Sequence, residues 1–145
     1  MTQIVLAVLP EELSIHRLPE STELTQVLAD RAQVDNNGKH HLFATLHSQD
    51  ELSIVCAATL TVDSESSSGP WRAIHVIGPL DFALTGVLSG LAAPLAAAHI
   101  SIFAISSYDT DYVLVKAEAL EAAIDALKDA GYSFCLLYTS DAADE

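Results

Sequence analysis

Two carboxylates, Asp109 and Asp111, stand between two strand-like apolar runs in SSYDTDYVLV, residues 106–115. A carboxylate at such a position either caps the N–H groups of a turn or accepts hydrogen bonds from a cationic group of a ligand. Asp111 begins the second run, where exposure to solvent is the alternative to ligand contact. The pair predicts a turn and makes an ammonium group a candidate ligand.

The loop GPLDFALTG, residues 78–86, has the complementary chemistry. A helix that starts at its end leaves the backbone N–H groups near Thr85, Gly86 and Val87 without intrahelical partners, and these attract a carboxylate. Gly86 has no Cβ to keep a ligand away from the backbone. Asp81 offers an acceptor for an ammonium group, although Asp81 and Thr85 could each serve simply as an N-cap.

Apolar periodicity downstream of residue 72 predicts the order βαββαβ. Because the crossover helix makes the first two strands of this unit parallel, their carboxyl ends share one edge of the sheet. We expect the first strand to lie beside the strand at residues 100–106, so that Asp109 approaches the helix start. The predicted strands are 73–77, 100–106, 112–116 and 132–136, and the predicted helices are about 85–98 and 119–130.

The two predicted helices differ in character. The second is amphipathic and is followed by Gly131, which predicts a left-handed C-terminal cap. The first is apolar all round, and Pro94 within it predicts a kink or an early break. His99 is expected to cap its C-terminus. Because the strands at 100–106 and 112–116 are apolar on both faces, a second domain or subunit is expected to cover the face that the helices leave open.

The chain is expected to have two halves joined by the polar stretch VDSESSSGPW, residues 62–71. The predicted division is 1–62, a linker at 63–70, and 71–135. In the first half the pattern predicts strands near 4–9, 13–18, 42–47 and 52–57, and a short helix near 22–32. The ending CLLYTSDAADE resembles translated read-through of a sequencing adapter, so residues 136–145 are treated as a non-native tail.

Composition narrows the class of protein. The 145 residues are 50% hydrophobic and 18% charged, with a net charge of -14, so a soluble globular protein is expected. The negative charge opposes binding to nucleic acids and to anionic membranes. The opening MTQIVLAVLP has no basic segment before its apolar run and reads as a strand, which leaves the cytoplasm as the expected location. Cys56 and Cys135 lie singly in apolar runs and predict reduced core residues.

The histidines are the one group of residues that suggests a different kind of site, one for a metal ion. His41 and His47 lie six residues apart on a predicted strand, about 20 Å along it, so one metal ion cannot bind both unless the strand breaks. Neither they nor His40 have a cysteine or carboxylate nearby to complete a ligand set. His75 is expected in a strand as a partly buried polar residue. The sequence contains no recognisable nucleophile or phosphate-binding motif, so no metal, no cofactor and no catalytic residue is predicted.

With the βαββαβ order, the segment IGPLDFALTGVLSGLAAPLAAAHISIFAISSYDTDYVLVKAEALEAAIDALKDAGY, residues 77–132, resembles the ACT domain family. LSIHRLP (13–19) and DELSIVC (50–56) resemble the first half of small bacterial proteins with two ACT-like halves. These are related to the ACT domains of the cytosolic arginine sensor for TOR signalling and of aspartate kinases. The resemblance implies an α+β, ferredoxin-like ACT domain preceded by a second, degenerate ACT-like half without the family's glycine-containing loop.

The resemblance also implies a function. ACT domains commonly bind the backbone groups of an amino acid at the loop that runs into the first helix, which corresponds here to residues 78–86. Together with Asp109 and Asp111, this predicts a non-enzymatic regulatory or sensor module that binds a small amino acid or related metabolite at an interface between ACT units, within a possible homodimer. The alternative is a structural dimerisation domain with no ligand.

Overall fold

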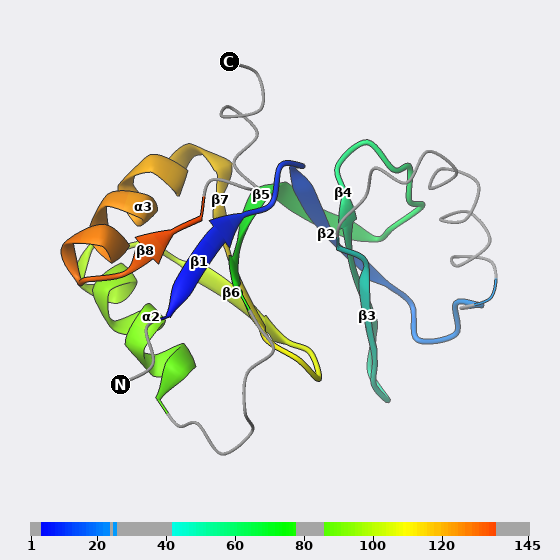
Figure 1. Cartoon of the computed structure of the whole chain (residues 1–145). Helices are drawn as coiled ribbons and strands as arrows, with labels where there is room; N and C mark the ends of the chain where they lie inside the picture. The colour runs from blue at the N-terminus through cyan, green and yellow to red at the C-terminus, as the bar shows by residue number, and fades with distance from the viewer. Residues whose placement is uncertain (1–3, 24, 26–41, 78–85, 136–145) are drawn as a thin grey trace. The chain divides into compact units, whose positions relative to one another are not determined.

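The computed structural model describes residues 4–23, 25, 42–77 and 86–135 (Figure 1). The chain divides into two compact units. Unit 1 is made of Met1–Pro10 together with Arg72–Glu145, and unit 2 is Glu11–Trp71. The sequence predicted two halves, but it assigned residues 1–10 to the first of them, whereas the structure places these residues with the second.

Unit 1 contains the predicted βαββαβ order, and the chain has the mixed α+β, ferredoxin-like architecture. The last five residues of β5 belong to this unit. A 3-10 turn at Ala117–Ala119 leads into its second helix. Its elements are β5 (Ser66–Val76), α2 (Val87–Ala97), β6 (Ile102–Ser106), β7 (Asp111–Lys116), α3 (Leu120–Asp129) and β8 (Ser133–Phe134).

An additional strand from the N-terminus completes this sheet. β1 (Val5–Val8) pairs antiparallel with β5, with Leu6 opposite Val76, and parallel with β8, with Leu6 opposite Phe134. The strand order in unit 1 is therefore β8–β1–β5–β7–β6. Hydrophobic alternation predicted that β1 is a strand. It could not show which strands pair with β1, because alternation indicates only which face of a strand is buried.

The structure corrects one predicted pairing. β5 lies beside β7, and β6 pairs with β7 as the outer strand of an antiparallel hairpin that runs from Ile102 opposite Val115 to Ser106 opposite Asp111. The expectation that β5 lies beside β6 was wrong. The four-residue turn after Ser106 makes β6 and β7 partners of each other, so that only the returning strand reaches β5.

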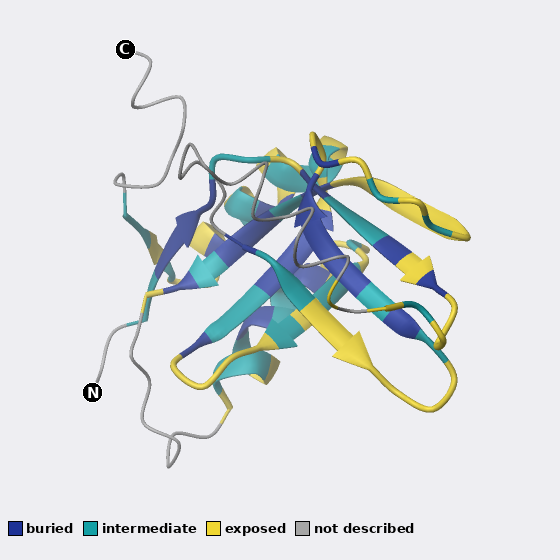
Figure 2. Cartoon of the chain, turned by 90° about the vertical axis from the view of Figure 1, so that its right-hand side faces the viewer, coloured by how far each residue is buried: buried dark blue, intermediate teal, exposed yellow. Residues whose placement is uncertain are grey.

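The core of unit 1 lies between one face of the sheet and the two helices. Each strand contributes alternate residues to it, and the helices contribute residues four apart, as their periods require. Figure 2 shows the buried residues, in dark blue, concentrated along the strands. The fully or almost fully buried members are Leu6, Ile74, Val76, Leu91, Leu95, Val113, Val115, Ala123 and Leu127.

Both helices end in the same motif. In α2 the N–H of His99 bonds the carbonyl of Ala96 (2.9 Å), and that of Ile100 bonds Leu95 (2.9 Å). The corresponding bonds after α3 are made by Gly131 and Tyr132. The pattern is a Schellman motif, which requires a positive φ at the residue after the cap. That φ is 61° at His99 and 103° at Gly131, so both predicted C-terminal caps are confirmed.

Pro94 does not break α2. The helix continues for three residues beyond it, to Ala97, so of the two predicted alternatives, a kink or an early break, the early break does not occur. Leu91 and Leu95, on either side of the proline, are fully buried in the core. Their burial offsets the backbone hydrogen bond that a proline removes from a helix.

The two caps give a matched prediction. His99→Gly should raise the free energy of unfolding by about 1 kcal/mol, because glycine adopts a positive φ without the steric cost that other L-residues incur. Gly131→Ala should lower it by about 1 kcal/mol. A Cβ at Gly131 would have no atom within 4 Å. A lower free energy of unfolding in Gly131→Ala would therefore come from the positive φ and not from a clash with a neighbour. Urea denaturation of the two variants measures both, and changes of the same sign would contradict the account.

Unit 2 is a sheet in the order β3–β4–β2–β5, to which β5 contributes its first six residues. β2 (Leu13–Leu18) pairs antiparallel with β4 (Leu52–Ala57), which also pairs with β3 (Ala44–His47). The predicted strands 13–18, 42–47 and 52–57 are thus confirmed. The helix predicted near 22–32 lies largely outside the described residues.

The expected linker is part of a strand. Residues 66–70 belong to β5 and pair with β2, with Ser68 opposite Ile15 and Ser67 opposite His16. A serine- and glycine-rich composition favours a loop only when the backbone groups lack partners, and here β2 supplies them. Gly69 also lies where an added Cβ would be only 3.2 Å from the carbonyl oxygen of Leu13. The linker prediction was therefore wrong for Ser66–Pro70.

The core of unit 2 is smaller. Leu52, Ile54 and Cys56 of β4 are fully buried there beside Leu18 and Leu60. Burial raises the pKa of the Cys56 thiol to about 11, so the thiolate that a nucleophile requires is scarce at neutral pH. Within the described ranges the longest helix, α2, has eleven residues, so none of these helices could cross a bilayer.

Candidate functional site

The candidate site lies at one edge of the unit 1 sheet. In Figure 1 the end of β5, the start of α2 and the β6–β7 turn all lie at the lower edge of this unit. A hydrogen bond from the Thr110 hydroxyl to the carbonyl oxygen of Val76 ties the turn to the end of β5. Gly86 and Asp109 therefore belong to the same edge, even though β7 separates β5 from β6.

Among the described residues, no side chain caps the first turn of α2. Gly86 is the N-cap residue, with φ 78° and no side chain to cap the helix, and the first turn contains no acidic residue. The N–H of Gly90 makes the first intrahelical bond, to the carbonyl of Gly86 (2.8 Å). The preceding N–H groups of the helix have no intrahelical acceptor, so the positive end of the helix dipole favours an anion there.

Val87 can contribute to such a site only through its backbone. Its side chain packs against the core of unit 1. Ser89, two residues further, turns its hydroxyl back to the carbonyl of Gly86 (3.2 Å). At the helix start, Gly86, which has no Cβ, thus stands directly before the first N–H groups of α2.

The β6–β7 turn is closed by Ser107 and not by Asp109. The Ser107 hydroxyl accepts a hydrogen bond from the N–H of Thr110 (3.2 Å), and the N–H of Ser107 bonds the carbonyl of Thr110 (2.8 Å). Asp109 is exposed, and within the described part of the chain no group donates a hydrogen bond to its carboxylate. Asp109 therefore does not cap its own turn, which was the alternative to contact with a ligand.

Asp111 has a structural partner. Its Oδ1 accepts a hydrogen bond of 2.6 Å from the hydroxyl of Ser106, directly opposite it in the hairpin. Asp111 is half-buried at the first position of β7, as predicted. One carboxylate oxygen is thereby used to close the strand pair, which makes Asp111 the weaker of the two candidate acceptors.

Sequence reasoning missed Thr110 and Tyr108. Thr110 is 6% exposed and connects the turn to Val76, whereas Tyr108 is 81% exposed at the tip of the same turn. A threonine between two aspartates is common in turns. Its hydrogen bond to Val76 could be expected only if the pairing of β7 with β5 were known. An exposed tyrosine beside two carboxylates was the visible signal for a contact surface.

Asp81 and Thr85 lie outside the described residues, as do His40 and His41. Among the described histidines, Nε2 of His47 bonds the carbonyl oxygen of Glu20 (3.0 Å). The ring of His75 stacks on Tyr112 with ring centres 4.6 Å apart, and burial lowers its pKa. His75 is half-buried in β5, as predicted.

The sequence comparison shows a likeness to one family. Residues 66–129, which run from the start of β5 to the end of α3, match the model of the ACT domain family. Over 65 residues the chain is 40% identical to the cytosolic arginine sensor for mTORC1 subunit 1 of Homo sapiens. That alignment covers 43% of this chain and 20% of the sensor, so the chain spans about a fifth of the sensor's length.

Solved structures extend the likeness to almost the whole chain. Protein Atu0741 from Agobacterium tumefaciens is 29% identical, with a TM-score of 0.77, over 93% of this chain and 94% of its own. The regulatory subunit of aspartate kinase from Thermus flavus has a TM-score of 0.59 at 13% identity, over 86% and 95% of the two chains. At that identity the second likeness shows the fold alone.

Proposed function

We propose that the chain is a non-enzymatic regulatory or sensor module that binds a small amino acid at an interface between ACT-like units. One observation carries the proposal: the open first turn of α2 and the exposed carboxylate of Asp109 lie at the same edge of an ACT domain sheet. A zwitterion needs donors for its carboxylate and an acceptor for its ammonium group. This edge offers both.

The relatives support the regulatory part of the proposal. One of them, 40% identical over 65 residues, is named as a cytosolic arginine sensor. In the proposed scheme unit 2 is a degenerate ACT-like half, since it has ACT-like strands but no helix between β4 and β5. The ligand-binding residues are then Gly86, Val87 and Asp109, with Asp111 and the loop residues Asp81 and Thr85 completing the set.

Such a module signals by differential binding. A ligand that contacts two surfaces together favours the arrangement in which they meet, and it shifts the equilibrium by its difference in affinity for the two arrangements. A shift of about tenfold corresponds to about 1.4 kcal/mol. We propose a second copy of the chain as the partner that supplies the second surface.

Calorimetric titration with each of the twenty amino acids tests the proposal. We expect one amino acid to bind and Asp109→Asn to weaken its binding by about tenfold, because the substitution removes a charge-assisted hydrogen bond to the ammonium group. Asp125→Asn is the matched control. It makes the same charge change at an exposed position of α3 that is not among the proposed ligand-binding residues, and it should leave the affinity unchanged.

Two outcomes would contradict the proposal. The first is that no amino acid binds. The second is that Asp109→Asn and Asp125→Asn weaken binding equally, because the carboxylate would then contribute only to the general negative potential of the chain.

The alternative, a structural dimerisation domain without a ligand, also has an observation in its favour. β6 pairs only with β7 among the described strands, so one side of it is an unpaired edge that a second copy could extend. This alternative predicts a dimer in sedimentation whose stability does not change with any amino acid or with Asp109→Asn.

A further inference from the structure

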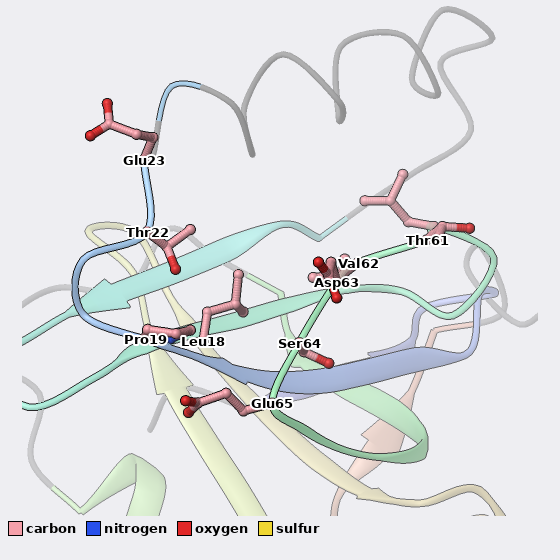
Figure 3. Close-up of a pocket in the computed structure, with 10 residues that line it drawn as sticks. Leu18, Pro19, Thr22, Glu23, Thr61, Val62, Asp63, Ser64 and Glu65 are labelled. Atoms are coloured by element: carbon pink, nitrogen blue, oxygen red, sulfur yellow. The ribbon is translucent and has the colours of Figure 1, made fainter.

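Unit 2 contains a pocket that the proposed amino-acid site does not use. Its volume is about 530 Å³, which lies within the range of small-molecule sites. Two segments line it: the end of β2 with the residues that follow it, and residues 60–65 before β5. Figure 3 shows Leu18 and Thr22 on the first segment and Val62 and Asp63 on the second.

The pocket has an apolar floor that belongs to the core of the unit. Leu18 and Leu60 are members of the buried cluster, and Val62 packs against it. In unit 1 the connection from β7 to β8 contains the helix α3, which covers the sheet. The corresponding connection in unit 2, residues 58–65, contains no helix. The pocket thus gives access to apolar surface that a helix covers in the other unit.

The polar lining of this pocket is acidic. Glu23, Asp63 and Glu65 line it, and none of the described lining residues is a lysine, arginine or histidine. Arg17 lies 3.7 Å from Glu65, but both side chains are more than half exposed, so this pair neutralises little. Thr22, Thr61 and Ser64 add hydroxyl groups.

One buried histidine contacts a residue of the pocket wall. His16, 7% exposed, bonds the hydroxyl of Ser64 through Nδ1 at 3.0 Å, and its buried Nε2 has no hydrogen-bond partner among the described residues. Burial lowers the pKa of His16, which favours the neutral ring. A neutral imidazole carries no positive charge, so His16 does not offset the carboxylates that line the pocket.

We propose that this pocket binds an aliphatic diamine or polyamine. The methylene chain would cover the floor formed by Leu18, Leu60 and Val62, while the ammonium groups would pair with the carboxylates around it. The described lining favours this ligand over an amino acid, because none of these residues has a cationic side chain to receive a carboxylate. The occupant therefore differs in charge type from the zwitterion proposed for unit 1.

Calorimetric titration of the full chain with 1,5-diaminopentane tests this inference, with 5-aminopentanoate as the matched probe that replaces one ammonium group by a carboxylate. We expect the diamine to bind at least about tenfold more tightly than 5-aminopentanoate. Asp63→Asn should weaken diamine binding at least about fivefold. Val62→Phe, which fills the pocket without changing charge, should abolish it while thermal denaturation shows that the protein is folded.

The net charge of -14 attracts any cation, so the control must change charge elsewhere. Asp129→Asn, at an exposed position at the end of α3, removes one negative charge just as Asp63→Asn does and should leave the diamine affinity unchanged. Equal effects of the two variants, or tighter binding of 5-aminopentanoate, would overturn the proposal. Asp109→Asn should also leave diamine binding unchanged, which separates this site from the amino-acid site.

Discussion

Replacing Leu95 by alanine should lower the free energy of unfolding of unit 1 by about 3 kcal/mol. Leu95 is fully buried in α2 and belongs to the core that the helices and the sheet share. The substitution removes its transfer free energy from water and leaves a cavity, because the rigid neighbours in the strands collapse only partly. It also removes one of the two leucines that stabilise α2 around Pro94.

Urea denaturation followed by far-UV circular dichroism measures this loss, since α2 and α3 both belong to unit 1. Leu46→Ala is the control. The same atoms are removed from a side chain that is 67% exposed in β3, so the change should stay within about 0.5 kcal/mol. If the two variants lose similar amounts, Leu95 does not occupy the core.

Lowering the pH from about 7.5 to about 5.5 should destabilise the protein through His16 and His75. Burial lowers the pKa of both rings in the folded state. The unfolded chain therefore binds more protons than the folded chain once the pH falls below the ordinary histidine value of about 6.5. The contribution of the two neutral rings to the free energy of unfolding is fully present above about pH 6.5. It is lost as the pH falls through the lowered pKa values that the rings have in the folded protein.

The largest slope that each ring can contribute is about 1.4 kcal/mol per pH unit. His16→Leu removes one of the two rings and should roughly halve the slope of unfolding free energy between about pH 6.5 and 5.5. Carboxylates titrate mainly below this window. Denaturation at three pH values measures the slope, with His47→Gln, a change at an exposed ring, as the control. A slope that His16→Leu leaves intact would show that His16 is not the responsible group.

Local patterns predicted the elements better than their partners. Periodicity placed α3 and its cap at Gly131 to within a residue or two, because an amphipathic stripe and a glycine are both local signals. The pairing of β5 with β7, and of β1 with β8, depends on contacts between segments far apart in sequence. Nothing in the residues of β1 distinguishes a strand of unit 1 from a strand of unit 2.

The features that the sequence did not predict also depend on contacts between segments far apart in the chain. Ser66–Pro70 read as a linker from composition, yet β2 satisfies the backbone of this stretch and its polar side chains remain exposed. For the candidate site, the types of residue at Gly86 and Asp109 could be read from the sequence, but the bond between Thr110 and Val76 that fixes the turn to β5 could not. The pocket of unit 2 was not predicted, since it arises from a helix that is missing between β4 and β5.

The position of β1 has a consequence for how this domain is made. A ribosome releases Val5–Val8 first, but the strands that flank it, β5 and β8, emerge more than fifty residues later. Closing so long a loop is slow, and until it closes β1 has no permanent partner. A fragment limited to residues 71–135 would hold an empty slot between β5 and β8. The β1 of a neighbouring molecule fits that slot, so strand exchange is the natural failure of this architecture.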